Sequence, residues 1–284
     1  MNWKDYEKEI QDYFTNAYPK ADISHNVKIL GRYSQTERQI DILIEDYVAG
    51  NRIRIVVDGK YFSEKIDVKN VEMFIGMLND CEVNKGILIS HEGFTEAAIK
   101  RAHYDPLDID LDILNFKDLN QFQNYGGIPF CGDHGVIAPA PFGWIIDGTS
   151  RQNMLATFYQ RGLTFEEAVK SKEWIYVNIM SKDSTVKSLD DFLELQKEYT
   201  MRDFPNAKID FLPTVKREGR ESKLRTIEIA SYPTIEYTGF VEFEEFIFFA
   251  VLFTPLELKR KNIRKLEEIM LNALPLNIIQ VKTK

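Results

Sequence analysis

Apolar side chains recur along the first half of the chain with two periods, which predict helices alternating with strands. The helical period places Trp3, Tyr6, Ile10 and Phe14 along one stripe. The same spacing predicts helices over residues 3–18, 68–80 and 93–102. Period-two alternation, or short β-branched runs, predicts strands over residues 24–30, 38–45, 53–60, 84–90 and 108–116. A hairpin turn over residues 47–51 and a short helix over residues 117–124 complete this half.

The second half has a different order of elements, with longer strands in succession near its end. Strands are predicted over residues 155–159, 174–180, 208–212, 225–232, 235–243 and 246–254. Helices are predicted over residues 165–171, 189–202 and 256–273, with Ser188 as an N-cap. We therefore expect an antiparallel meander covered by helices, in an α+β domain.

Glycine and proline are concentrated between the two halves. Residues 126–143 contain five glycines and three prolines in eighteen positions, a density typical of a domain boundary. We expect a mixed-sheet α/β domain over residues 1–124, a linker over 125–143 and the antiparallel domain over 144–284. His134 lies in this segment, where a linker histidine is the simpler interpretation and a metal ligand the alternative.

The strand over residues 53–60 ends in Asp58-Gly59-Lys60. Because side chains alternate along a strand, Asp58 and Lys60 project to one side, and Ile53, Ile55 and Val57 are expected in a core on the other. A carboxylate followed two residues later by an ammonium suits a metal-dependent hydrolase, in which the acid holds a divalent cation. The lysine then orients an attacking water or neutralises developing charge. A salt bridge at a strand end is the alternative.

Two further acids are placed to join this site. Asp41 lies mid-strand, where aspartate is disfavoured. Its neighbours Ile40, Ile42 and Ile44 are expected on the opposite face of the strand. The hairpin brings Asp41 near Asp58 across the ladder. Glu7 borders the apolar stripe of the first helix, where it either forms a salt bridge or faces a metal site.

This set of elements resembles a known family. The stretches are Arg38-Gln39-Ile40-Asp41-Ile42-Leu43-Ile44, Val57-Asp58-Gly59-Lys60-Tyr61 and Lys85-Gly86-Ile87-Leu88-Ile89-Ser90, followed by Gly93-Phe94-Thr95. Over roughly residues 3–120 they resemble the PD-(D/E)xK nuclease superfamily, and within it the Mrr-like restriction endonucleases. The resemblance implies a restriction-endonuclease-like mixed sheet flanked by helices.

The same resemblance implies a Mg²⁺- or Mn²⁺-dependent endonuclease that hydrolyses DNA phosphodiesters. In that family the helix acid, the strand aspartate and the D/E-x-K acid bind the metal, and the lysine assists the water. These roles fall on Glu7, Asp41, Asp58 and Lys60, with Glu9 as the alternative helix acid. The signature more often reads Glu-Cys-Lys, whereas Gly59 stands at its centre here and still offers a carbonyl ligand. A catalytically silent nuclease-like scaffold is the alternative function.

The second half more faintly resembles the PsbP-like α/β/α sandwich, through Pro141-Phe142-Gly143-Trp144 and its element order. We expect it to bind rather than catalyse, because it holds no histidine after His134. Its partner is unknown. This half also contains a basic group: Lys216, Arg217, Arg220, Lys223 and Arg225. The group forms either a DNA-contacting loop or a solvated loop.

Charge and composition change this picture in one respect. The net charge is −8, and residues 1–124 hold 15 Lys and Arg against 22 Asp and Glu, giving −7. A DNA partner then requires a metal and a local basic patch to offset that charge.

We expect a cytoplasmic protein. The two cysteines have no metal-ligand spacing, no apolar stretch is long enough for a membrane span, and the start is not signal-like. A homo-oligomer is compatible with the sequence.

Overall fold

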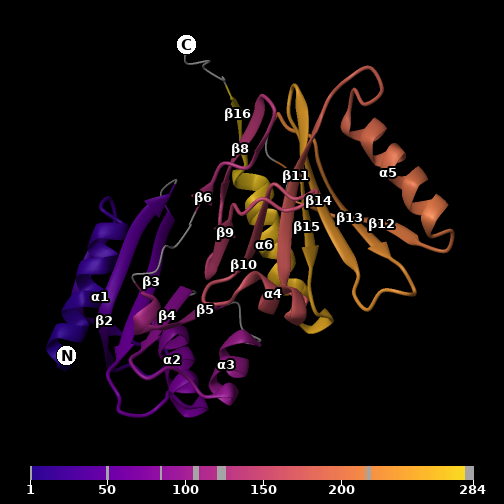
Figure 1. Ribbon diagram of the computed structural model, residues 1–284. Coiled ribbons are helices and arrows are strands. Elements are labelled where there is room, and N and C mark those ends of the chain that lie inside the picture. Colours follow the sequence, from indigo (N-terminus) through magenta and orange to yellow (C-terminus); the bar gives the residue numbers. More distant parts are fainter. Residues whose placement is uncertain are drawn as a thin grey trace. The chain divides into compact units, whose positions relative to one another are not determined.

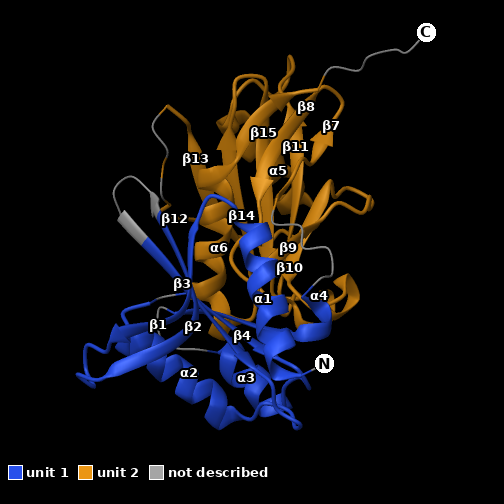
Figure 2. Cartoon of the chain, turned by 90° about the vertical axis from the view of Figure 1, so that its left-hand side faces the viewer, with its two compact units in different colours: residues 1–122 blue, residues 123–284 orange. Residues whose placement is uncertain are grey.

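The computed structural model describes residues 2–48, 51–83, 85–104, 109–119, 126–214, 216 and 219–278. The chain forms two compact units, Met1–Phe122 and Gln123–Lys284 (Figure 2). Each has its own sheets, helices and core, and each is described by itself. The mixed α/β class predicted from the sequence is confirmed. Among the described residues, no helix is long and apolar enough to cross a membrane.

Unit 1 is built on one five-stranded sheet in the order β1-β2-β3-β4-β5 (Figure 1). Its strands are β1 (Asp22–Leu30), β2 (Glu37–Val48), β3 (Asn51–Lys60), β4 (Lys85–Ser90) and β5 (Asp110–Asn115). The first three pair antiparallel, and β3, β4 and β5 pair parallel, so the sheet is mixed. Residues 49 and 50 of the predicted turn lie outside the described residues.

Helices cover both faces of this sheet. They are α1 (Trp3–Ala17), α2 (Val68–Asp80), α3 (Glu96–His103) and the 3-10 turn η1 (Phe116–Asp118). Asn2, Asp67 and Thr95 cap the first three by accepting hydrogen bonds from backbone amides of the first turn. A Cβ on Gly59 would meet α1, and one on Gly86 would meet α2, so these helices lie against opposite faces. Only η1 lies in the short helix predicted over 117–124, whose residues 120–124 are outside the described part.

The alternation expected along β2 and β3 is interrupted where the candidate acids lie. Ile40 and Leu43, three residues apart, both belong to the core cluster beneath α2 and α3. Strict alternation would send them to opposite faces, so the predicted division of β2 into two faces is wrong. Ile53, expected in the core, is 37% exposed, whereas Val57 is fully buried.

Unit 2 contains a seven-stranded antiparallel sheet in the order β12-β13-β14-β15-β11-β10-β9. Its strands are β9 (Trp144–Asp147), β10 (Ala156–Gln160), β11 (Trp174–Ser181), β12 (Lys208–Leu212), β13 (Ser222–Glu228), β14 (Glu236–Glu242) and β15 (Phe246–Phe253). Its helices are α4 (Phe165–Ser171), α5 (Leu189–Asp203), η2 (Leu256–Leu258) and α6 (Lys259–Asn272). The predicted meander is present as β12 to β15, and Ser188 caps α5 as predicted.

The Gly/Pro-rich segment is part of unit 2 and not a linker. It forms β6 (Gly126–Gly127), β7 (Phe130–Cys131) and β8 (His134–Pro139), and β8 pairs with β16 (Leu274–Asn277) near the far end of the chain. Val136 and Ala138 are fully buried in the main core of the unit. His134, interpreted as a linker residue, stacks on Phe246 with ring centroids 5.1 Å apart.

Candidate functional site

The carboxyl end of β3 holds the predicted acid–lysine pair in direct contact. Lys60 Nζ lies 2.8 Å from Asp58 Oδ1 and 2.7 Å from its Oδ2. The Asp58 side chain is 9% exposed, and that of Lys60 is 32% exposed. The pair therefore joins a buried carboxylate to a lysine that solvent reaches.

Asp41 places a second carboxylate beside Asp58. The β2–β3 ladder pairs Ile42 with Val57, and continuing this register by one residue sets Asp41 opposite Asp58. The ladder ends there, and the Gly59 amide instead donates to Asp41 Oδ2 at 3.4 Å. The structure thus brings Asp41, Asp58 and Lys60 together, as the hairpin argument predicted.

Burial and the second acid set the electrostatics of Asp58. Desolvation, followed by the hydrogen bond with Asp41, raises its pKa from 3.8 to about 7, and Lys60 offsets only part of this rise. Two acids held together in a buried setting cannot both ionise cheaply, because each charge disfavours the other. A bound cation would remove this penalty.

Glu7 and Tyr6, on the first turns of α1, face the acids from the helix. Partial desolvation and the charge of Asp41 raise the pKa of Glu7. Tyr6 is fully buried, and its hydroxyl donates to the Ile89 carbonyl at 3.0 Å. Burial and the charge of Asp58 raise the tyrosine pKa above its ordinary value. Glu9, the alternative helix acid, is not among the residues that line the pocket beside Asp41.

Packing against α1 explains why a glycine, Gly59, stands at the centre of the signature. A Cβ there would lie 2.9 Å from Ile10 Cδ1 and 3.1 Å from Tyr6 Cε1, closer than side-chain carbons tolerate. Glycine therefore lets α1 pack directly on β3 beside the acids. This packing also accounts for the departure from the more usual Glu-Cys-Lys.

The acids do not by themselves form a compact metal cage. Among the described residues, no group of three or more His, Cys, Asp or Glu side chains is arranged to hold a metal ion. The chemistry of the donors nevertheless fits a hard divalent cation, since Mg²⁺ prefers one or two carboxylates and keeps several waters. The buried Asp58, whose pKa is raised by burial and by the adjoining Asp41, is the observation that supports this fit.

A pocket of about 390 Å³ opens beside these acids in unit 1. Strands β1, β2 and β3 form one side, and the exposed start of α1 forms the other. Its lining comprises Trp3, Glu7, Ile10, Gln11, His25, Asn26, Gln39, Asp41, Ile42 and Gly59. Sequence reasoning found the acids but missed the polar residues of β1, because their spacing carries no motif.

Comparison with known proteins finds a family model that is similar to the part of the chain that holds this site. Residues 1–121 match the family model described as restriction endonuclease, Mrr_cat. The match covers unit 1 and confirms the resemblance found in the sequence. The acid–lysine cluster thus lies within the residues that match this family model. No curated protein matches the chain.

Three solved structures share distant likenesses with the chain. A protein of unknown function, AF1548, is 18% identical over 38% of this chain and 57% of its own, with a TM-score of 0.30. Cyanobacterial PsbP from Synechocystis sp. PCC 6803 is 11% identical over 51% of this chain and 96% of its own, with a TM-score of 0.35. LpqN of Mycobacterium tuberculosis, involved in cell envelope biogenesis, is 7% identical over 53% and 90%, with a TM-score of 0.33. This chain therefore spans little more than half of AF1548, and at these scores the likenesses carry no functional argument.

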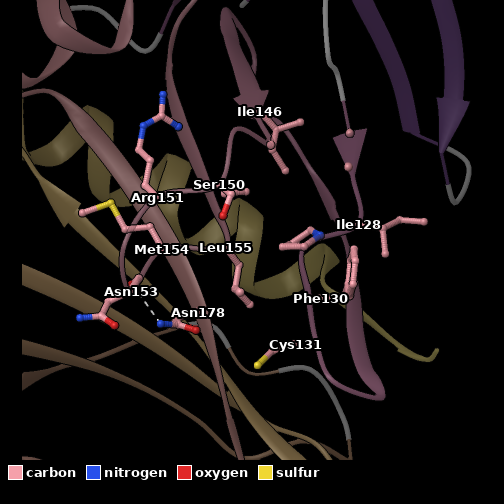
Figure 3. Close-up of a pocket in the computed structure, with 15 residues that line it drawn as sticks. Ile128, Phe130, Cys131, Ile146, Ser150, Arg151, Asn153, Met154, Leu155 and Asn178 are labelled. Carbon is pink, nitrogen blue, oxygen red and sulfur yellow. Dashed lines mark hydrogen bonds between the residues drawn. The ribbon is translucent and has the colours of Figure 1, made fainter. Parts of the chain in front are cut away.

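Unit 2 has a larger pocket of about 590 Å³, lined by both apolar and polar side chains (Figure 3). Ile128, Phe130, Ile146, Met154 and Leu155 line it, with the exposed Cys131 at one side. Its one cationic residue is already engaged: Arg151 donates to Asp147 Oδ2 at 2.8 Å and lies 4.0 Å from the centre of the Phe165 ring. The lining offers no acid–lysine set like that of unit 1.

The described members of the basic group of unit 2 each have a partner within the unit, although Lys216 is exposed. Arg225 is 4% exposed and donates to Gln196 Oε1 and Glu236 Oε1. Arg220 donates to the Ala273 carbonyl. Lys216 pairs with Glu221, and Lys223 with Asp190, while Arg217 lies outside the described residues. Arg220 and Arg225 are therefore engaged in the fold, whereas the interpretation of the loop around Lys216 stays a prediction.

Proposed function

We propose that unit 1 is a Mg²⁺- or Mn²⁺-dependent endonuclease that hydrolyses DNA phosphodiesters. The observation that carries this function is the contact of Asp58, Asp41 and Lys60 at the end of β3. It lies within residues 1–121, which match the restriction endonuclease family. The reaction adds water to phosphorus and breaks one backbone P–O bond, leaving a phosphate monoester and a hydroxyl.

Asp41 and Asp58 would hold the cation, with the Gly59 carbonyl and Glu7 as further oxygen ligands. The cation supplies Lewis-acid stabilisation of the phosphate charge when it is bound. Lys60 is placed to orient the attacking water or to neutralise charge on the phosphate oxygens, since its ammonium already lies 2.7 Å from Asp58. Glu7 would orient water or hold a second ion.

The position of Lys60 also offsets the acidity of the unit. Residues 1–124 carry a net charge of −7, and two of the acids lie at the site itself. A divalent cation and Lys60 together bring three positive charges to the point where the phosphate must lie. DNA binding by unit 1 should therefore depend on the metal.

Cleavage of supercoiled plasmid tests this function. In Mg²⁺ or Mn²⁺, Lys60→Ala should cut at least about 100-fold more slowly than the wild type, the scale for one electrostatic or acid–base group. Lys85→Ala is the matched control, because Lys85 forms a similar strand ion pair with Asp110 at 3.1 Å, on β4. Equal rates for Lys60→Ala and the wild type would refute the role of Lys60.

A nuclease-like scaffold without catalysis is the second candidate. The raised pKa of Asp58 is the observation that favours a scaffold, because a scaffold requires no ionised acid pair. The two candidates differ in metal binding. The nuclease should gain thermal stability from Mg²⁺, and Asp58→Ala should abolish that gain. A scaffold should gain none. For unit 2 we propose a binding role, for which its pocket of about 590 Å³ is the supporting feature. Its partner and the oligomeric state stay predictions to be tested.

A further inference from the structure

The pocket beside Asp41 has a composition that hydrolysis alone does not require. Its acids are Glu7 on α1 and Asp41 on β2, and its remaining polar side chains are amides or a histidine: Gln11, His25, Asn26 and Gln39. A metal-dependent hydrolysis uses carboxylates, water and a lysine, and gives no role to three amides. Their presence indicates a neutral group with both hydrogen-bond donors and acceptors as the occupant.

The backbone is strained where this pocket meets the acids. Asn26 has φ +51°, the left-handed region that non-glycine residues rarely occupy. The β1–β2 ladder keeps one register on both sides of it, pairing His25 with Ile42 and Val27 with Ile40, so Asn26 lies opposite Asp41. A left-handed non-glycine residue inside a strand is strained, and such strain is concentrated at functional sites.

The strained residue is held in place by its neighbour on the next strand. Gln39 Nε2 donates to Asn26 Oδ1 at 2.7 Å. This bond uses the Asn26 oxygen and the Gln39 nitrogen, so the other atoms of the two joined amides are a donor, Asn26 Nδ2, and an acceptor, Gln39 Oε1. A donor next to an acceptor matches the hydrogen-bonding edge of a nucleobase.

An aromatic ring lies at the mouth of the same pocket. Trp3 lines the pocket and is 53% exposed, with Lys4 Nζ 5.5 Å from the ring centre. Exposed indole rings form stacking surfaces for bases, because every base presents a π-face. A phosphate would instead meet the carboxylates of Glu7 and Asp41, which repel it unless a cation intervenes. The volume of about 390 Å³ falls in the range of small-ligand sites.

We propose that this pocket takes one unpaired or extruded nucleobase of the DNA strand. The base stacks on Trp3 and bonds through its edge to Asn26 and Gln39. Its own backbone phosphate then lies beside Asp41, which belongs to both the pocket and the acid pair. The choice of DNA rests on the proposed function, and the preferred substrate is accordingly DNA with a bulge, mismatch or flipped base.

Binding of three labelled duplexes to the full chain tests the pocket. One is fully paired, the second has a single unpaired thymine, and the third has an abasic residue at the same bulge. All proteins carry Lys60→Ala and are assayed by fluorescence anisotropy in Mg²⁺, so that slow cleavage does not disturb the equilibrium. The unpaired thymine should lower Kd at least about tenfold relative to the abasic bulge, the scale for one stacked base.

Trp3→Ala and Gln39→Ala should each reduce this preference to about threefold or less. Tyr33→Ala is the matched control: Tyr33 is 67% exposed in the same unit with Arg32 over its ring, yet does not line the pocket. Circular dichroism melts verify that each variant folds. Equal Kd values for thymine and abasic bulges, no measurable binding, or an unchanged preference in both pocket variants would each overturn the proposal.

Failure of the pocket and failure of the proposed hydrolysis give different results. A tenfold preference for the unpaired thymine, with wild-type plasmid left intact in Mg²⁺, would support the pocket and refute hydrolysis. Plasmid cleavage that Lys60→Ala abolishes, without any preference between the bulges, would support hydrolysis and refute the pocket.

Discussion

Replacing Asp58 by Asn should stabilise the metal-free protein near pH 8 while abolishing cleavage. Asn has nearly the same shape and can keep a hydrogen bond with Asp41, but it carries no charge into the buried site. The Asp58 pKa rises from 3.8 to about 7 on folding, because of burial and then Asp41. Each pKa unit corresponds to about 1.4 kcal/mol, so ionised Asp58 costs the folded state up to about 4 kcal/mol.

The pH dependence gives this prediction its sign. A raised pKa stabilises the folded state fully below pH 4, and that contribution is lost as the pH rises from about 4 to about 7. The free energies of unfolding of wild type and Asp58→Asn should therefore agree near pH 4. They should then diverge, with Asp58→Asn more stable by about 2–4 kcal/mol at pH 8.

Scanning calorimetry of the full chain in EDTA measures this difference, on the transition of unit 1. Asp80→Asn is the matched control with the opposite sign. Asp80 is buried in the same unit, and Ser34, Arg38 and the Tyr33 amide hold its pKa well below the usual range. Asp80→Asn should destabilise the protein at pH 8, and its effect should shrink below pH 4. A wild type more stable than Asp58→Asn at pH 8 would refute the electrostatic reasoning.

Three further predictions address the neighbours of Asp58. Glu7→Gln should reduce plasmid cleavage by less than Lys60→Ala does, whereas Glu9→Gln should leave the rate within twofold of wild type. Equal losses of rate in Glu7→Gln and Glu9→Gln would contradict the assignment of Glu7 as the helix acid. Gly59→Ala should lower the free energy of unfolding by about 1–3 kcal/mol, because its Cβ meets Ile10 and Tyr6, and unchanged urea stability would contradict the packing argument. Millimolar Mg²⁺ should raise the melting temperature of the wild type at pH 8 but not that of Asp58→Asn, and equal shifts would place the cation elsewhere.

Local sequence patterns were sufficient for most elements of unit 1 and for its acid cluster. The helix over Val68–Asp80 begins and ends where the apolar period predicts. The approach of Asp41 to Asp58 follows from one hairpin register, which is a local property of two adjacent strands. Such features depend on neighbours close in sequence, and the sequence therefore contains them.

The failures have one physical cause, namely partners distant along the chain. Residues 126–143 were predicted as a linker from Gly and Pro, yet Ile137 of β8 pairs with Leu274. Arg225 was expected in an open or solvated loop, but Gln196 and Glu236 hold it in a buried position. The break in alternation at Asp41 depends on the left-handed Asn26 on the adjacent strand. None of these partners is visible in the local period of apolar residues.

Cleavage of methylated and unmethylated plasmid by the wild type and by Asp58→Ala, in Mg²⁺ or Mn²⁺, tests the central claim most directly. Both plasmids are needed so that a preference for base modification is not mistaken for inactivity. We predict that the wild type converts at least one of them to open-circular or linear DNA, that EDTA stops the reaction, and that Asp58→Ala leaves both supercoiled. Cleavage that persists undiminished in Asp58→Ala, or supercoiled DNA throughout with the wild type, would contradict the account.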